Sequence, residues 1–456
     1  MSPIDGLLLA ALLGAGVWRL AWPERWRGVR TPVCVALIAL AVLQIARLGF
    51  TWQFLGGYLL LGALALPWRA SSRPGRAAAG LGLGLLLLTA LGPWVVLPAP
   101  SLPAPRGPYA VGSAIYRWVD ASRAETMTAD PTDRRNVIAQ AWYPAARPTA
   151  GGRKIAYMDG LGQLPAQVVE LPRFIFRRFG QADTHAIDRA PVSAARSRWP
   201  VVVFSPGYGA PRFAYAGLLA DLASRGYAVV ALDHPYESPV VQLADGRVVG
   251  PAPLHFSPGA SRVPHMERQV VVRSADVRFV LDQLARAEAV GPLAGRLDLE
   301  RAAVIGHSFG GATAVLTASH DPRVRAAADI DGMLYGDVRG AAFRGPLLLV
   351  QSAKTDDIGP YAVATRAAIA DVPAGGWRYA IGESNHLSFT DAERFMSPPA
   401  RWVAARVMHG ARGAADTQAV TVDLLDAFLH GPLRGEPGDI AAVAARARDV
   451  RGGREP

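Results

Sequence analysis

Hydrophobic positions divide this chain into two parts. Within the first hundred residues, apolar side chains run almost without interruption over four stretches, at about 4–21, 32–49, 51–67 and 79–97. A helix needs about 20 residues to cross a hydrocarbon core of roughly 30 Å. The third stretch reaches that length only if Thr51 and Trp52 begin it. Because no polar face remains to meet water, we interpret residues 1–97 as about four transmembrane helices.

Arginines are unevenly distributed between the ends of these stretches. Three lie between the first and second stretch and three between the third and fourth, whereas the remaining turn has only Arg47. The six are Arg25, Arg27, Arg30, Arg69, Arg73 and Arg76. Cytoplasmic loops carry the excess of Lys and Arg. We therefore expect an integral protein of a bacterial cell membrane whose remaining chain lies on the periplasmic or extracellular side.

The pattern changes after a Pro-rich segment at 98–108, which we expect to be a stiff, extended linker. From 109 to 434, short apolar runs alternate with amphipathic segments, and this alternation predicts a mostly parallel sheet flanked by helices. Residues 435–456 are expected to form a peripheral basic tail. The predicted strands are at 138–142, 201–204, 228–232, 302–305, 326–330, 347–351 and 378–381, and the predicted helices at 218–224, 270–284 and 312–319.

A glycine-flanked serine follows one of the predicted strands. Segment 306–311 reads Gly-His-Ser-Phe-Gly-Gly, between the strand at 302–305 and a helix. Such a turn needs small flanking residues, and it holds the serine hydroxyl out at the carboxyl edge of the sheet. We therefore predict that Ser308 is a nucleophile. The alternative is an ordinary serine in a Gly-rich turn.

A serine nucleophile requires a histidine as base and an acid that orients the histidine. His386 lies in a polar loop after the last predicted core strand, where a base should arrive. His320, His409 and His430 lie in or beside helical segments, and we interpret them as structural. His386 is therefore the predicted base.

Two positions can supply the acid. Asp331 lies at the carboxyl tip of the strand at 326–330, beside a glycine. Asp356 and Asp357 follow the next strand. The residues alone leave both alternatives open.

Attack on a carbonyl also requires two backbone N–H donors for the oxygen that becomes negatively charged. One donor normally belongs to the residue after the nucleophile, here Phe309. The loop Ser-Pro-Gly-Tyr-Gly at 205–209 follows an earlier predicted strand. It makes Tyr208 the expected second donor.

These stretches together resemble the plasma, lipoprotein-associated type of platelet-activating factor acetylhydrolase and its bacterial dienelactone-hydrolase-like relatives. The resemblance covers roughly residues 109–430, and it is carried by segments 204–209, 221–234, 276–282, 306–311, 329–333 and 385–386. It implies an α/β-hydrolase fold and a serine esterase that acts on short or oxidised acyl esters, including the sn-2 acyl group of phospholipids. It also implies Asp331 as the acid, with Asp356 as runner-up. Segments 157–190 and 236–266 do not match, which leaves the acyl preference open.

Two further features have competing interpretations. The aromatic and basic run Phe-Ile-Phe-Arg-Arg-Phe at 174–179 is either a lid or membrane-docking helix, or a packed surface helix. His234 lies at the end of the strand at 228–232, where it either lines the pocket or fixes a loop.

Charge and composition narrow the remaining classes. The net charge of +11 comes from arginines throughout the chain, without the aromatic interleaving or motif of a nucleic-acid partner. It indicates affinity for anionic lipid surfaces, or only an Arg-rich composition. With no metal-ligand spacing and no phosphate-binding loop, we predict neither metal nor cofactor. The alternative functions are a membrane-tethered general carboxylesterase or polyester hydrolase, and a non-catalytic membrane sensor or binding module.

Overall fold

The computed structural model describes residues 3–67, 73–96, 101–147, 152–159, 182–253, 261–335, 343, 345–356, 369–370, 372–407 and 410–455. The aromatic run at 174–179, Asp357 and His409 lie outside these ranges, as does the side chain of Asp356. By internal contacts the chain forms two compact units: the first contains residues 1–100 and 394–403, and the second contains most of the chain from residue 101 onward. Each unit is described by itself.

The first unit consists of apolar helices that pack on one another. Its elements are α1 (Pro3–Ala21), α2 (Pro23–Leu48), the 3-10 turn η1 (Trp52–Phe54), α3 (Leu55–Ala65) and α4 (Arg73–Val96). Leu8, Leu12 and Phe54 are fully buried between them, whereas Leu81 on α4 is 76% exposed. Apolar side chains thus form both the interior and much of the outer surface of this unit.

Three of these helices have the length and composition to cross a membrane: Pro3–Ala21, Pro23–Leu48 and Ala77–Val96. The fourth apolar segment, Trp52–Ala65, is shorter. The second helix begins nine residues before the predicted stretch, at Pro23 rather than residue 32. Proline suits the first turn of a helix, where its missing N–H costs no hydrogen bond. The arginines from Arg25 to Arg30 are therefore helical rather than in a loop.

The second unit is built on a ten-stranded mixed sheet, with the order β12-β11-β10-β9-β8-β4-β5-β2-β1-β3. Neighbouring strands from β11 to β5 are parallel. Strand β12 is antiparallel to β11, β2 is antiparallel to both β5 and β1, and β3 is parallel to β1. The bounds are β1 Ala110–Ala124, β2 Arg134–Ala145, β3 Ala186–Asp188, β4 Trp199–Ser205, β5 Ala228–Asp233, β8 Leu297–His307, β9 Val324–Ile330, β10 Leu347–Ser352, β11 Gly376–Ile381 and β12 Val450–Glu455. A separate hairpin pairs β6 (Val241–Gln242) with β7 (Val248–Val249).

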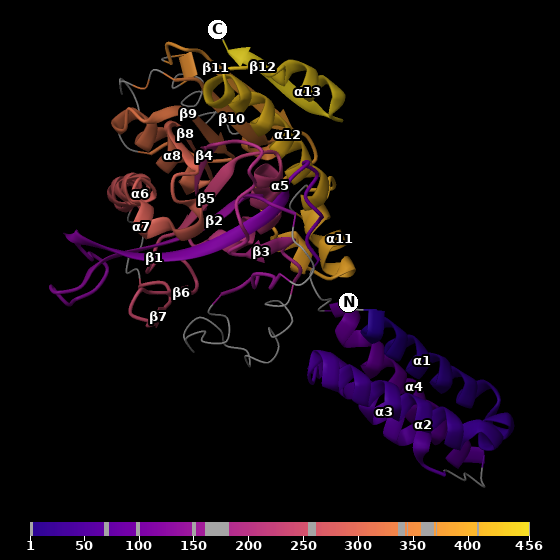
Figure 1. Ribbon diagram of the computed structural model, residues 1–456. Helices are drawn as coiled ribbons and strands as arrows, with labels where there is room; N and C mark the ends of the chain where they lie inside the picture. The colour runs from indigo at the N-terminus through magenta and orange to yellow at the C-terminus, as the bar shows by residue number, and fades with distance from the viewer. Residues whose placement is uncertain are drawn as a thin grey trace. The chain divides into compact units, whose positions relative to one another are not determined.

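Helices cover both faces of this sheet (Figure 1). On one face, α8 (Phe309–His320) packs on β8 and β9 and against α6 (Val263–Leu284); on the other, α12 (Gly413–Arg434) packs across the central strands beside α5 (Ala216–Ser224). The remaining short helices of this unit are η5 Arg212–Tyr215, α7 Ala287–Val290, η6 Gly291–Leu293, α9 Ala353–Asp356, η7 His386–Phe389 and α13 Ile440–Arg446. Two further helices, η8 (Ala392–Phe395) and α11 (Pro398–Val407), include residues 394–403, which belong to the first unit. The predicted strands and helices all lie within these elements.

The expected linker and the expected basic tail both contact the second unit. The tail after residue 435 contains α13, and its last strand β12 pairs antiparallel with β11 at the edge of the sheet. The linker, from residue 101 onward, packs on the same unit, since Arg106 forms an ion pair with Asp221. The β11 edge supplies backbone hydrogen-bond partners for the tail, and the Asp221 carboxylate supplies a charge partner for the linker.

Candidate active site

Ser308 lies on a strained turn between β8 and α8. Its backbone has φ 55° and ψ −124°, in a region that L residues rarely adopt. Its N–H donates to the carbonyl of Ile330 at 2.8 Å. A Cβ at Gly306 would overlap the carbonyl of Gly310, and a Cβ at Gly310 would overlap that of Ser205. The glycines are therefore required by the close approach of strand and helix, as a nucleophile turn demands.

His386 and Asp331 lie together at the same edge of the sheet. His386 Nδ1 is 2.8 Å from Asp331 Oδ2. The acid follows β9, where its backbone adopts φ 53°, and the histidine begins η7 after β11. The Asp331 side chain is fully buried, while that of His386 is 48% exposed. The carboxylate thus fixes one ring nitrogen and leaves Nε2 for other partners.

The acid is held in its ionised form by its contacts. Burial alone would raise the pKa of Asp331, but the hydrogen bond and charge of His386 and the Ser352 N–H lower it below its ordinary value. That N–H donates to Asp331 Oδ1 at 2.7 Å. Two residues earlier, burial and the nearby Asp331 raise the pKa of Asp329 well above its ordinary value. The surroundings thus shift the two pKa values in opposite directions, favouring the charged form of Asp331 and the neutral form of Asp329.

A hydrogen-bonded cap sets the position of the His386 loop. The side chain of Asn385 accepts from the Leu387 N–H at 2.8 Å, and Ser388 Oγ accepts from the Asn385 N–H at 3.2 Å. Glu393 then accepts from Ser388 Oγ at 2.9 Å. Among the described residues, no hydrogen bond joins Ser308 Oγ to His386.

The loop after β4 lies beside the serine. A Cβ at Gly207 would be 3.3 Å from Ser308 Cβ. The Gly207 N–H donates to Tyr215 Oη at 3.0 Å. The backbone N–H groups of Tyr208 and Phe309, the two expected oxyanion donors, make no hydrogen bond to another described residue. Both are thus available to an acceptor near Ser308.

Tyr215 and His307 connect this loop to the histidine. Tyr215 Oη is 2.9 Å from His307 Nδ1, and His307 Nε2 is 3.0 Å from the backbone carbonyl oxygen of His386. Burial and the nearby His386 lower the pKa of His307 to about 3, so this ring is neutral. A neutral ring that donates from Nε2 accepts at Nδ1 from the tyrosine hydroxyl. The contact between His307 and the loop of His386 was not predicted. His307 is adjacent to Ser308, and side chains of adjacent residues on a tight turn usually point in different directions.

A buried ion pair lies behind the same loop. Arg273 on α6 donates from Nε and Nη2 to Glu237 Oε2, at 3.0 and 2.8 Å. Its Nη1 also donates to the carbonyl of Pro206 at 2.7 Å, and its Nη2 to that of Gly207 at 3.4 Å. Both ionised side chains are 1% exposed. The carbonyls of the loop thus supply the remaining acceptors that a buried guanidinium needs.

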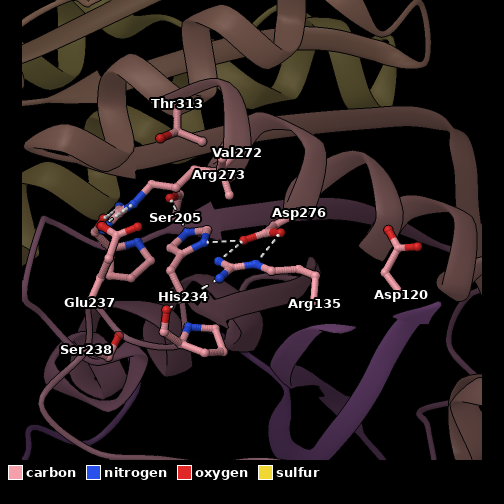
Figure 2. A network of polar contacts seen from close by, with 12 residues as sticks. Asp120, Arg135, Ser205, His234, Glu237, Ser238, Val272, Arg273, Asp276 and Thr313 are labelled. Carbon is pink, nitrogen blue, oxygen red and sulfur yellow. Dashed lines mark hydrogen bonds and ion pairs between the residues drawn. The ribbon is translucent and has the colours of Figure 1, made fainter. Parts of the chain in front are cut away.

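A second buried cluster joins the end of β4 to the strands and helix around it (Figure 2). Ser205 Oγ is 3.0 Å from His234 Nε2, and His234 Nδ1 is 2.8 Å from Asp276 Oδ2. Arg135 donates hydrogen bonds to both oxygens of that carboxylate. Burial and the charge of Arg273 lower the pKa of His234 to about 4. The side chain of His234 has no exposed surface. This burial fits the interpretation that His234 fixes a loop, and it does not fit a residue that lines an open pocket.

Neither arginine was predicted from sequence as part of this region. Asp276 lies in a segment that carried the resemblance, but a single charged residue on a helix usually faces solvent. In the described part of the chain, no group of three or more His, Cys, Asp or Glu could hold a metal ion. That the protein needs no cofactor stays a prediction.

Comparisons with known proteins agree with this architecture. The family model for platelet-activating factor acetylhydrolase, isoform II, matches residues 96–245 and 274–398. The solved structure of a ferulic acid esterase from Streptomyces cinnamoneus matches with TM-score 0.65 and 29% identity, over 78% of this chain and 99% of that one. The mixed, mostly parallel sheet with helices on both faces is thus an α/β-hydrolase fold, as expected.

Two relatives of known sequence carry names of the same family. A probable 1-alkyl-2-acetylglycerophosphocholine esterase from Arthroderma benhamiae is 26% identical over 54% of this chain and 62% of its own length. The platelet-activating factor acetylhydrolase of Cavia porcellus is 27% identical over 43% of this chain and 49% of its own length. The chain therefore spans about half to three fifths of these relatives. Since the family model covers more than half of the chain, this protein belongs to the platelet-activating factor acetylhydrolase, isoform II, family.

Proposed function

We propose that this protein is a membrane-anchored serine esterase that hydrolyses short or oxidised acyl esters, including the sn-2 acyl group of phospholipids. The observation that carries the proposal is the hydrogen bond of 2.8 Å between Asp331 and His386, beside the strained Ser308. The family supports the reaction class, because its relatives are named as acetylhydrolases and as an esterase.

In the proposed mechanism, Ser308 Oγ attacks the acyl carbonyl carbon while His386 Nε2 takes its proton. Asp331 orients the ring through Nδ1 and stabilises the imidazolium that forms. The N–H groups of Tyr208 and Phe309 donate to the oxyanion. As the tetrahedral intermediate collapses, His386 returns the proton to the leaving alkoxide. Water, activated by the same histidine, then releases the acid from the acyl-serine.

Of the two candidate acids, only Asp331 is seen in contact with the proposed base among the described residues. Asp331 contacts the base, whereas the side chain of the runner-up Asp356 lies outside the described residues. We therefore propose Asp331 as the acid. Substitution of each aspartate by asparagine distinguishes the two.

Membrane anchoring rests on the helices of the first unit. Three have the length and composition to span a bilayer, and leucines on α4 are exposed on the outer surface, where lipid would cover them. The arginine distribution favours the periplasmic or extracellular side for the second unit. A bilayer would thus hold the esterase close to lipid substrates.

Hydrolysis of p-nitrophenyl acetate and butyrate by the detergent-solubilised full chain tests the proposal. We expect Ser308→Ala to lower kcat by about 10⁶ and Asp331→Asn by about 10⁴, while Asp356→Asn retains activity. A wild type no faster than Ser308→Ala, and unlabelled by a fluorophosphonate, would instead support the non-catalytic binding module.

A general carboxylesterase is the second candidate. It is favoured by the likeness to the ferulic acid esterase, which is named for ferulic acid rather than for a phospholipid. A series of acyl chain lengths on glycerophospholipids and on p-nitrophenyl esters separates the two candidates. A preference for the phospholipids at short sn-2 chains supports the first, and equal or faster turnover of the simple esters supports the second.

A further inference from the structure

The peptide group between Gly207 and Tyr208 receives a hydrogen bond on its carbonyl side from a buried cation. Arg273 Nη2 donates to Gly207 O at 3.4 Å, and Nη1 donates to the preceding carbonyl, that of Pro206, at 2.7 Å. Glu237 Oε2 accepts hydrogen bonds from Nε and Nη2 of the same guanidinium. Figure 2 shows the guanidinium of Arg273 next to Glu237, to one side of Ser205.

This contact also determines where the N–H of the same peptide points. A peptide group is planar, and no cis peptide bond occurs among the described residues. In a trans peptide the C=O and N–H directions are opposed. A donor fixed on Gly207 O therefore fixes the direction of the Tyr208 N–H, away from Arg273. A cation at the oxygen also polarises the group, which strengthens the hydrogen bond that its N–H can donate.

The same guanidinium contacts the residue that carries the second expected donor. Its central carbon is 4.8 Å from the centroid of the Phe309 ring and 5.8 Å from that of Tyr208. At these distances a cation is attracted to the face of an aromatic ring. One buried charge thus holds both residues whose N–H groups are proposed to bind the oxyanion.

We propose that Arg273, held by Glu237, is a positioning residue that orients and polarises the oxyanion donors. This inference rests on the proposed esterase function, and it adds a role that the Ser308, His386 and Asp331 assignment does not contain. Arginine is required because its planar fork serves the two carbonyls and the carboxylate at once. Lysine would keep the charge but not all of these bonds.

An ester and its thiono analogue test this role, since sulfur accepts hydrogen bonds more weakly than oxygen. Full-length wild type, Arg273→Met and Arg273→Lys are compared on p-nitrophenyl acetate and O-4-nitrophenyl thionoacetate. Rates are divided by the number of sites that a fluorophosphonate labels, so that misfolded protein is not counted. Arg135→Met is the matched control, because Arg135 is equally a buried arginine paired with carboxylates and makes no hydrogen bond to residues 206–208 among those described.

Loss of one oxyanion donor costs about 10² to 10³ in kcat, and a mispositioned donor should cost less. We expect Arg273→Met to lower kcat for the ester by about 10- to 100-fold, with KM little changed and a much smaller loss for the thionoester. Arg273→Lys should lie between this variant and wild type. Arg135→Met should lower the melting temperature but keep the wild-type ratio of ester to thionoester rates.

Two outcomes would overturn the proposed role of Arg273. One leaves the proposed esterase function intact, and the other contradicts that function as well. If wild type is active and the arginine variants lose ester and thionoester rates by the same factor, or lose neither, Arg273 is only structural and the esterase proposal stands. If wild type hydrolyses neither substrate faster than Ser308→Ala, the proposed function fails and this inference fails with it.

Discussion

His307 Nε2 lies 3.0 Å from the backbone carbonyl oxygen of His386, so the residue before the proposed nucleophile supports the loop of the proposed base. The other nitrogen of the same ring meets Tyr215 Oη, which accepts from the Gly207 N–H. A continuous path of three hydrogen bonds therefore joins the oxyanion loop to the base loop. Movement of either loop would disturb the other.

Removal of the Tyr215 hydroxyl should test this path. Tyr215→Phe leaves the Gly207 N–H and His307 Nδ1 without their partner, and a buried unsatisfied group costs about 1–3 kcal/mol. We expect that loss in urea unfolding, together with a kcat about tenfold lower, because small misplacements of reacting groups are costly. Tyr116→Phe is the control, since Tyr116 Oη is buried and donates to Val290 O, away from the site. Equal kcat losses in the two variants would contradict the prediction.

Acid should destabilise the fold through its buried histidines. Burial lowers the pKa of His234 to about 4 and that of His307 to about 3, from 6.5. The folded state thus binds fewer protons than the unfolded chain, so this stability is complete above about pH 6.5 and is lost as the pH falls through 4. The stability lost in this way through protonation of His234 is about 3 kcal/mol in total.

Urea unfolding between pH 7.5 and 4 measures this effect. His234→Gln should show a shallower loss of stability with falling pH than wild type. His320→Gln should retain the wild-type slope, because His320 is exposed at the end of α8. A His234→Gln profile parallel to that of wild type would show that this ring is not the titrating group.

Alanine at Gly310 should disrupt the turn that holds Ser308. Its Cβ would overlap the carbonyl of Ser205. Because Ser205 belongs to strand β4 and Gly310 to helix α8, neither backbone can move aside without disturbing its own element. We expect Gly310→Ala to lose more than about 3 kcal/mol, as core overpacking can, and to lose fluorophosphonate labelling. Gly431→Ala is the matched helical control, because its Cβ would meet nothing within 4 Å apart from its chain neighbours and its own helix backbone. That change should be neutral or stabilise by about 0.5–1 kcal/mol. Comparable melting temperatures for the two variants would refute the steric argument.

The proposed topology predicts opposite accessibility for two exposed positions. In a Cys34→Ala background, a cysteine placed at Ala121 on β1 should react with a membrane-impermeant maleimide in intact spheroplasts. A cysteine placed at Arg25, at the start of α2, should react only after permeabilisation. Both positions are exposed within their own units, so burial does not explain a difference. The reverse labelling pattern would place the second unit in the cytoplasm.

Local pattern was enough to predict the elements around the site. The apolar runs before residues 308, 331 and 386 mark strands β8, β9 and β11, because a strand buried on both faces must be apolar along its length. The glycines at 306 and 310 likewise indicated the turn, since their requirement is steric and local. The four apolar stretches of the first unit also became helices, although α2 starts earlier than its apolar run and α3 is shorter.

Tertiary structure alone decided which charged groups meet. The residue pattern left Asp331 and Asp356 as alternatives because each follows a strand, and only the family resemblance favoured Asp331. The contact between Asp331 and His386 itself is formed by loops that converge in the folded chain. Arg273 and Glu237 are 36 residues apart, and β12 reaches its partner from the end of the chain. Contacts of this kind depend on which loops converge at one sheet edge, and neither periodicity nor local propensity encodes that convergence.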